Sequence, residues 1–152
     1  MKGSTNRPLI VYTDGSCKSS GVGGWAAIIE DGRRICEYCG GELKTTSHRM
    51  ELTAVIQALK AIGSPSRITV FTDSKYVADS VNRGSLAQWE LNGWKNVDGK
   101  LLKNIDLWQE LCKYLHIHKV EFQWVKAHSG NALNERCDKL AKEQSRARSD
   151  RR

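Results

Sequence analysis

The sequence has no long hydrophobic run and no secretion signal. No stretch reaches the roughly eighteen apolar residues that suggest a membrane-spanning helix, and Met1–Asn6 lacks the apolar core of a signal peptide. Its five cysteines are an odd number without the spacing of a disulfide framework, which is typical of a reducing compartment. These absences argue against an integral membrane protein and a disulfide-stapled secreted domain, and they predict a cytoplasmic protein.

The sequence also lacks the two pairs of cysteines or histidines that a typical zinc site requires. Cys36 and Cys39 form a Cys-x-x-Cys motif that could supply half of a zinc site or a redox pair. No second Cys-x-x-Cys or His-x₃-His motif follows it. The surrounding segment has a strand pattern, and residues three apart in a strand point to opposite faces. We therefore expect both cysteines to be structural residues.

Acidic residues are fewer than basic ones. The chain has 24 Lys and Arg against 17 Asp and Glu, a net charge of +7, which favours a polyanionic partner. Over half of the excess lies in Lys139–Arg152, with six basic and two acidic side chains. A length of 152 residues suits one well-packed domain. We expect a polar extension over residues 1–7, a folded domain over residues 8–146 and a basic tail over residues 147–152.

The predicted order of elements is three strands, a helix, a strand, two helices, a strand and a helix. Strand patterns cover residues 9–13, 25–30, 34–41, 67–72 and 119–125. Helical patterns cover residues 47–62, 74–82, 105–116 and 132–145. Residues 81–103 have an irregular pattern, and a frayed end is expected from Arg146 onward. This order predicts an α/β fold with a mixed five-stranded sheet flanked by helices.

Four acidic residues stand in distinctive positions. Asp14 and Asp73 each follow an apolar run with a strand pattern, whereas Glu51 and Asp138 lie in helical patterns. Two carboxylates at strand ends and two on helices can meet at one edge of a sheet. Like charges at such short range raise one another's pKa or bind cations, and Mg²⁺ suits carboxylates together with phosphate oxygens. The four residues together predict metal-assisted cleavage of a phosphodiester.

Each acid taken singly has an ordinary alternative. Asp14, which precedes a glycine, is compatible with a turn, and Asp73 is at the N-cap position of the following helix. Glu51 in a first helical turn is favoured by the helix dipole, and Asp138 is compatible with a solvated helix face. Chance does not readily place all four in these contexts, so the joint interpretation is preferred.

The local motifs belong together as a set. They are Thr13–Ser16, the segment from Thr45 through Arg49–Leu52, Thr72–Ser74, and the run from Lys126 to Asp138. In this order, with His128 ten residues before the last acid, they resemble type 1 ribonuclease H in its free-standing bacterial form. The resemblance covers about residues 8–146. It implies the ribonuclease H fold and a monomeric endoribonuclease that hydrolyses the RNA strand of RNA–DNA hybrids, leaving a 5′-phosphate and a 3′-hydroxyl.

The resemblance also implies roles for the site residues. Asp14 would bridge two Mg²⁺ ions, for which Mn²⁺ is a substitute, while Glu51 and Asp73 complete the site and Asp138 holds one ion. His128, in a loop of small residues, would assist proton transfer or product release, since an ordinary histidine pKa lies near neutrality.

Residues that meet the hybrid are implied in the same way. Thr46 and Arg49 are matched to a DNA phosphate contact. The residues matched to the groove are Cys17, Ser20, Ser47, His48 and Lys75. Trp89 and Trp94 resemble the aromatic part of a handle that packs on the DNA strand, although packing within the protein explains them equally well.

The departures from the family pattern leave the proposed metal ligands untouched. Ser47-His48 replaces a usual Asn-Asn pair, Lys75 a usual Gln and Ala127 a usual Gly, and the loop Cys17–Gly24 is short. Residues 81–103 lack the usual cluster of Lys and Arg. We therefore expect hybrid binding to depend partly on the basic C-terminal tail.

Three other functions compete with this interpretation. A hybrid-binding module without catalysis has no need of four converging carboxylates. A DNA-cutting transposase or resolvase is disfavoured by the motifs around Glu51 and Asp138 and by the lack of a further DNA-binding domain. A polymerase-associated nuclease domain is disfavoured because Met1 lies close to the first strand, which favours a free-standing enzyme.

Overall fold

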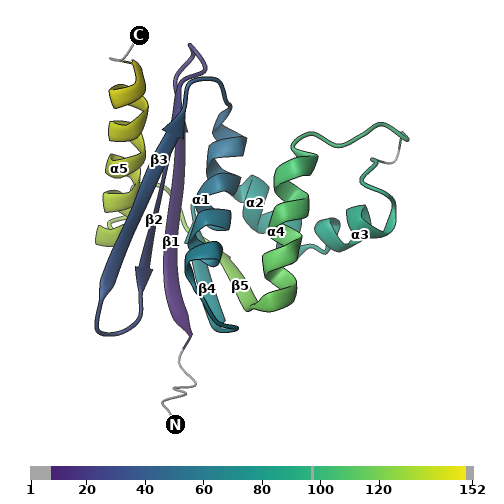
Figure 1. Ribbon diagram of the computed structural model, residues 1–152, viewed down its shortest axis with the longest axis horizontal. Coiled ribbons are helices and arrows are strands. Elements are labelled where there is room, and N and C mark those ends of the chain that lie inside the picture. The colour runs from purple at the N-terminus through teal and green to yellow at the C-terminus, as the bar shows by residue number, and fades with distance from the viewer. Residues whose placement is uncertain (1–7, 97, 150–152) are drawn as a thin grey trace.

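The computed structural model describes residues 8–96 and 98–149. The elements in chain order are β1 (Leu9–Cys17), β2 (Gly23–Glu30), β3 (Ile35–Glu42), α1 (Ser47–Ala61), β4 (Arg67–Thr72), α2 (Lys75–Asn82), α3 (Ser85–Leu91), α4 (Ile105–Ile117), β5 (Lys119–Trp124) and α5 (Ala132–Ser149). Figure 1 shows a sheet with α5 on one face and the other helices on the opposite side. Among the described residues, no helix is both long and apolar enough to cross a membrane.

The sheet is mixed, as the sequence predicts. Its strand order is β3-β2-β1-β4-β5. The hairpin strands β1, β2 and β3 pair antiparallel, while β4 pairs in parallel with β1 and with β5. The carboxyl ends of β1, β4 and β5 therefore meet at one edge of the sheet, where side chains from three distant parts of the sequence come together.

Two apolar cores, one on each face of the sheet, pack the helices against it. Alternation along β1 points Val11 into the larger core, beneath α1 and α4, and Tyr12 into the smaller one beneath α5. The stripe of α1 residues in the larger core is Leu52, Val55, Ile56, Ala58 and Leu59. Both helices that carry predicted site residues are thus fixed to the sheet by buried apolar side chains.

Two glycines bring these helices unusually close to the sheet. A Cβ at Gly15 would lie 2.5 Å from the backbone nitrogen of Glu51, so the first turns of α1 lie directly on β1. A Cβ at Gly24 would overlap the carbonyl oxygen of Ala141, so α5 packs on the bare backbone of β2. The ion pair of Arg136 with Glu37, 2.8 Å between Nε and Oε2, also ties α5 to β3.

Three predictions about where helices and strands begin, end or occur are wrong. β1 continues to Cys17, because its antiparallel pairing with β2 outlasts its parallel pairing with β4, and Asp14 lies inside the strand. The N-cap of α2 is not Asp73 but Ser74, whose hydroxyl accepts the N–H of Val77 at 3.2 Å. Residues 81–103 are not irregular throughout, since they contain α3.

The C-terminal helix is longer than predicted. α5 continues to Ser149 because Ser145 is buried and Arg148 donates to Gln144 at 3.0 Å. The expected fraying from Arg146 onward is therefore wrong for residues 146–149. The predicted extension over residues 1–7 and the last three residues of the tail lie outside the described part of the chain.

The cysteines are free thiols, and Cys36 and Cys39 lie exposed on β3. Within residues 8–96 and 98–149, neither cysteine belongs to a group of side chains that could hold a metal ion.

Candidate metal centre

The sheet register places two of the predicted acids beside each other. Thr13 of β1 pairs with Thr72 of β4 as the last pair of the parallel ladder. Asp14 and Asp73 therefore directly follow the last paired residues of these two neighbouring strands. Glu51 reaches the same place from α1. One carboxylate oxygen from each of these three acids lies within 4.8 Å of the other two.

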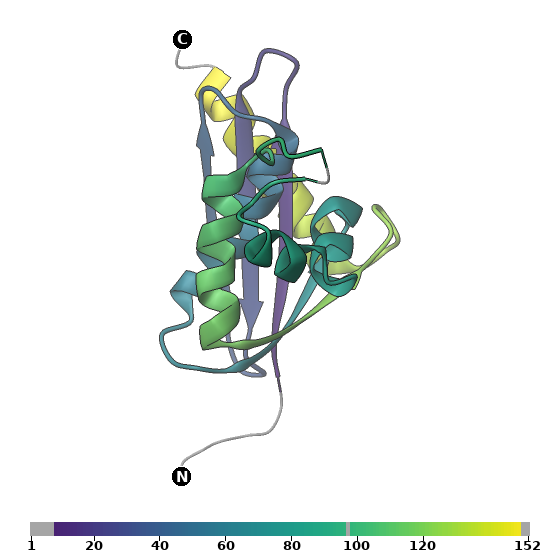
Figure 2. The same ribbon diagram turned by 90° about the vertical axis from the view of Figure 1, so that its right-hand side faces the viewer.

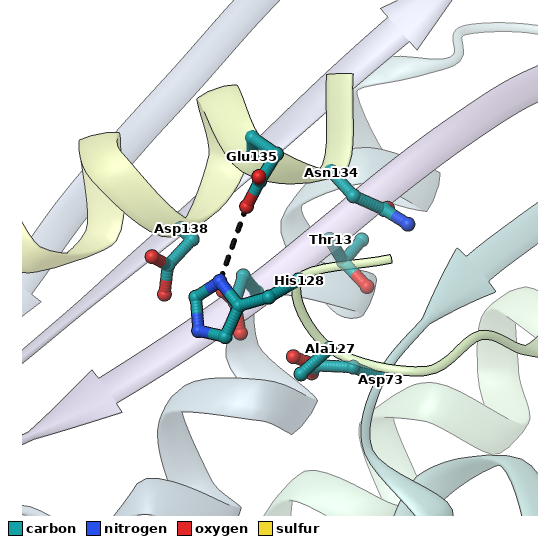
Figure 3. Close-up of a pocket in the computed structure, with 8 residues that line it drawn as sticks. Thr13, Asp73, Ala127, His128, Asn134, Glu135 and Asp138 are labelled. Atoms are coloured by element: carbon teal, nitrogen blue, oxygen red, sulfur yellow. Dashed lines mark hydrogen bonds and ion pairs between the residues drawn. The ribbon is translucent and has the colours of Figure 1, made fainter. Parts of the chain in front are cut away.

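The fourth acid approaches from the opposite face. Asp138 of α5 lines a pocket at this edge of the sheet together with Asp14, Asp73 and His128, and Figure 3 shows it beside the imidazole. One carboxylate oxygen of Asp138 is 3.2 Å from the ammonium nitrogen of Lys142, one helical turn further on. The structure therefore brings all four predicted acids to one site.

Burial and mutual repulsion perturb the acidity of the cluster. Desolvation, with the neighbouring carboxylate of Asp73 next in importance, raises the pKa of Asp14 to about 8. Desolvation also raises the pKa of Glu51 well above its usual range and that of Asp73 less strongly. The N–H of Gly15 donates to Asp14 at 2.8 Å and opposes the shift. Ionising the whole cluster without a counter-charge is therefore unfavourable.

The residues present fit a divalent cation. The Oε1 atom of Glu51 is buried and has no hydrogen-bond partner, which is costly for a polar atom away from water. One carboxylate oxygen of Glu51 lies within 4.8 Å of an oxygen of Asp14 and an oxygen of Asp73. A site made only of carboxylate oxygens suits a hard divalent cation, which would supply both the missing partner and the counter-charge.

His128 is held above the acids by a residue that the sequence did not single out. Nδ1 of His128 lies 3.1 Å from Oε1 of Glu135. In Figure 3 the imidazole lies between α5, which carries Glu135 and Asp138, and the Asp73 segment. The backbone of His128 is left-handed, with φ of 56°. This conformation turns the loop back toward α5, where the imidazole contacts Glu135. The only sequence signal for Glu135 is its place one turn before Asp138, and Lys142 has the matching place one turn after it.

The residues predicted to meet a hybrid surround the start of α1. Thr46 is the N-cap of α1, and its hydroxyl accepts the N–H of Arg49 at 3.2 Å. The guanidinium of Arg49 makes two hydrogen bonds to Asp106, at 2.7 and 3.0 Å. The hydrogen bonds from Arg49 lower the pKa of Asp106 below its usual range. Ser47 is exposed beside Thr46. Thr46 and Arg49 are thus both held in place, by local capping and by a bidentate ion pair.

The other predicted contacts lie on either side of this turn. Cys17 is half-buried, with its sulfur 3.5 Å from the carbonyl oxygen of Thr45, and Ser20 is exposed in the next loop. The imidazole of His48 stacks on Tyr76 with ring centroids 3.9 Å apart. Lys75 opens α2 and lies over the ring of Trp124.

The two tryptophans of the predicted handle lie next to this group, and Trp89 lines a pocket together with His48 and Tyr76. In Figure 1, α3 and the segment after it project away from the sheet beyond α4, and in Figure 2, viewed from that side, α3 lies in front of the sheet. Trp89 packs edge-on against the buried Trp108, with ring centroids 5.4 Å apart. Trp94 is half-buried and packs against the same core. Both tryptophans therefore have a packing role inside the protein.

Comparisons with known proteins place this geometry in context. The family model described as RNase H matches residues 6–146. A protein named Ribonuclease H from Nitratidesulfovibrio vulgaris is 49% identical over 141 residues, covering 92% of this chain and 90% of the relative. A Ribonuclease H from Caldicellulosiruptor saccharolyticus is 42% identical, covering 90% of this chain and 94% of the relative.

Solved structures show the same similarity in three dimensions. A crystal structure of LC9-RNase H1, described as a type 1 RNase H with the type 2 active-site motif, matches with a TM-score of 0.83 and 32% identity. The match covers 96% of this chain and 75% of that one. A foamy viral protease-reverse transcriptase in complex with RNA/DNA hybrid matches with a TM-score of 0.81 and 25% identity, covering 95% of this chain and 21% of the viral chain.

Proposed function

The chain belongs to the RNase H family, whose members hydrolyse the RNA strand of RNA–DNA hybrids, and from that premise we propose how its own residues perform the reaction. The fold is the ribonuclease H fold, and the protein is a metal-dependent endoribonuclease. The observation that carries the residue assignment is the group of three carboxylates within 4.8 Å, one of which has a buried, unpartnered oxygen.

The four acids form the metal site in this proposal. Asp14, Glu51 and Asp73 of the tight group would hold two ions, with Asp14 as the shared ligand, and Asp138 of α5 would add a ligand to one of them. Mg²⁺ is the proposed ion, with Mn²⁺ as a substitute, because the ligand atoms are carboxylate oxygens. Bound there, the ions supply activation of the attacking water and stabilisation of the leaving 3′ oxygen.

His128 and Glu135 act as a pair in the proposal. If Nδ1–H of His128 donates to Glu135, then Nε2 of the neutral ring is free to accept a proton. The Glu135 carboxylate orients the ring. The pair is thus suited to move a proton between the reaction centre and solvent, in agreement with the role that the sequence implies for His128.

Loss of His128 is expected to slow the reaction without removing it. His128→Ala should lower kcat about 10- to 100-fold, at or below the lower end of general acid–base effects, with KM for the hybrid changed less than about twofold. Steady-state cleavage of a labelled hybrid measures both constants. Glu135→Gln should give a smaller loss because the hydrogen bond can remain, and His116→Ala, which removes another exposed histidine, is the matched control. Equal losses for His128→Ala and His116→Ala would contradict the assignment.

Hybrid recognition centres on the start of α1 in this proposal. Thr46 and Arg49 contact a DNA phosphate, and Arg49 is already oriented by Asp106. The proposed groove residues are Cys17, Ser20, Ser47, His48 and Lys75. Trp89 and Trp94 shape the handle and present its surface to the DNA strand. We further propose a monomeric, cytoplasmic enzyme with one catalytic domain over residues 8–146, supported by its bacterial relatives and its five free thiols.

Cleavage of a labelled RNA–DNA hybrid tests the proposed function directly. With Mg²⁺ we expect the RNA strand to be cut internally to products with 5′-phosphate ends, while double-stranded RNA and single-stranded DNA remain intact. The selectivity follows from the need for 2′-hydroxyls on one strand and a DNA backbone on the other. Hybrid binding without cleavage in either Mg²⁺ or Mn²⁺ would instead identify a binding module.

A further inference from the structure

Trp124 is a large aromatic residue at the rim of the metal site, and 43% of it is exposed. It ends β5 and pairs with Thr72, the residue before Asp73. We propose that Trp124 is a positioning residue that fixes the backbone of Asp73 and, through the same ring, the side chain of Lys75. This inference rests on the proposed function of the site and goes beyond it.

The Asp73 segment is held by three side chains. The hydroxyl of Thr72 accepts the N–H of Ser74 at 3.0 Å, and the hydroxyl of Ser74 caps α2 through Val77. These two contacts are local. The third is the indole N–H of Trp124, which donates to the carbonyl oxygen of Asp73 at 3.0 Å. It alone of the three joins Asp73 to another element, across 51 positions of sequence.

The main effect of the hydrogen bond from Trp124 is to position the backbone of Asp73, since neither group depends on it for a partner. An exposed indole N–H and an exposed loop carbonyl can both bond to water, so the protein does not require this bond to avoid a buried, unpaired group. Its specific effect is to restrict rotation of the Asp73 peptide. The Asp73 carboxylate must stay within 4.8 Å of Asp14 and Glu51, and metal sites need ligands held to about half an ångström.

The ammonium group of a lysine lies over the face of the same Trp124 ring. The ammonium nitrogen of Lys75 lies 4.8 Å from the centroid of the Trp124 ring, within the range of a cation–π contact. Lys75 is exposed, at the first position of α2, two residues after Asp73. One indole therefore aligns a proposed metal ligand by its edge and a proposed substrate contact by its face.

Two substitutions separate these effects. Trp124→Phe removes the N–H but keeps an aromatic face, and we expect it to weaken Mg²⁺ binding measured by calorimetry without substrate by about tenfold, the lower end for partners of metal ligands. kcat should fall with it, while KM for the hybrid should change less. Lys75→Met should raise KM and leave Mg²⁺ affinity within about twofold, since the indole bond to Asp73 remains. Gln123→Ala, an exposed neighbour on β5, is the control for changes at this strand.

An NMR measurement on the unmodified protein tests the bond itself. The chain has five tryptophans, and the indole signal that disappears in Trp124→Phe identifies the proton of Trp124. We expect that proton to exchange with water more slowly than a free indole and its signal to shift when Mg²⁺ is added. Unchanged Mg²⁺ affinity in Trp124→Phe, or free exchange of that proton, would overturn the inference. If the unmodified protein cuts hybrids in the same experiments, the proposed function stands regardless.

Discussion

Asp14→Asn is expected to lower hybrid cleavage at least about 1,000-fold while making the metal-free protein more stable. Asp14 is one of the three acids of the tight group, and an amide oxygen carries neither the charge nor the bridging capacity of a carboxylate. In the proposed metal site, loss of this ligand removes much of the electrostatic stabilisation that the bound metal would provide, and such contributions reach several kcal/mol. Mg²⁺ binding measured by calorimetry should be lost with the activity.

The stability gain follows from the raised pKa of Asp14. In the unfolded chain this carboxyl ionises near its ordinary value, whereas in the folded, metal-free protein its pKa is about 8. The folded state therefore holds a proton that the unfolded state has lost between about pH 4 and pH 8, and the stability of the wild type falls as pH rises through that window. Asparagine does not titrate, so the advantage of the variant grows over the same window.

Thermal unfolding in a metal chelator measures this gain. At pH 8 we expect Asp14→Asn to be more stable by about 5 kcal/mol, and Tm should rise by roughly 10 °C or more. The gain has this size because the wild-type carboxyl ionises at about pH 8 in the folded state and at about pH 4 in the unfolded state. At pH 3, below the ordinary pKa of the carboxyl, the two proteins should unfold at nearly the same temperature. Glu121→Gln, which removes an exposed acid on β5, is the control for a change of one charge. A constant difference at all pH values would show that repulsion in the acidic cluster is not its cause.

Gly15→Ala is expected to cost about 100-fold or more in kcat without touching any ionisable group. The added Cβ would lie 2.5 Å from the backbone nitrogen of Glu51 and 2.6 Å from the carbonyl carbon of Met50. These are backbone atoms of a helix, so β1 and α1 must move apart. A displacement of about 1 Å at a catalytic group can cost two orders of magnitude, and overpacking costs about 1–3 kcal/mol of stability.

Gly63→Ala is the matched control for that substitution. No atom lies within 4 Å of a Cβ built at Gly63, and its backbone is not in the left-handed region. Kinetics and thermal unfolding should therefore be close to those of the unmodified protein. Near-normal activity in Gly15→Ala would contradict the close contact between β1 and α1 that the structure shows.

Sequence patterns predicted much of this fold because local and long-range information agree there. Two apolar runs that each end in an aspartate predict two neighbouring strands with carboxylates at one edge, and the parallel register of β1 and β4 places Asp14 and Asp73 accordingly. The stripe on α1 likewise predicts which face packs on the sheet and so where Glu51 lies. The roles of these residues in catalysis stay predictions until the variants are measured.

Other features depend on tertiary contacts that no local pattern contains. A turn was a reasonable alternative for Asp14 because glycine follows it, yet the glycine serves the close approach of α1 inside a strand. α3 lies in a segment of weak pattern and is stabilised by Leu86 and Trp89 against the core. Glu135 meets His128 only because the loop before α5 turns back with a left-handed residue.

The raised pKa values of the acidic cluster couple metal binding to proton release. Burial and mutual repulsion raise the pKa of Asp14, Glu51 and Asp73, so a cation that binds among them displaces protons that they retain to higher pH than ordinary carboxyl groups do. Loading the site is therefore an exchange of hydrogen ions for metal, and its measured heat will depend on the buffer that takes up what is released. Lowering the pH and lowering the metal concentration should therefore reduce metal binding in the same way, by leaving the acidic cluster protonated.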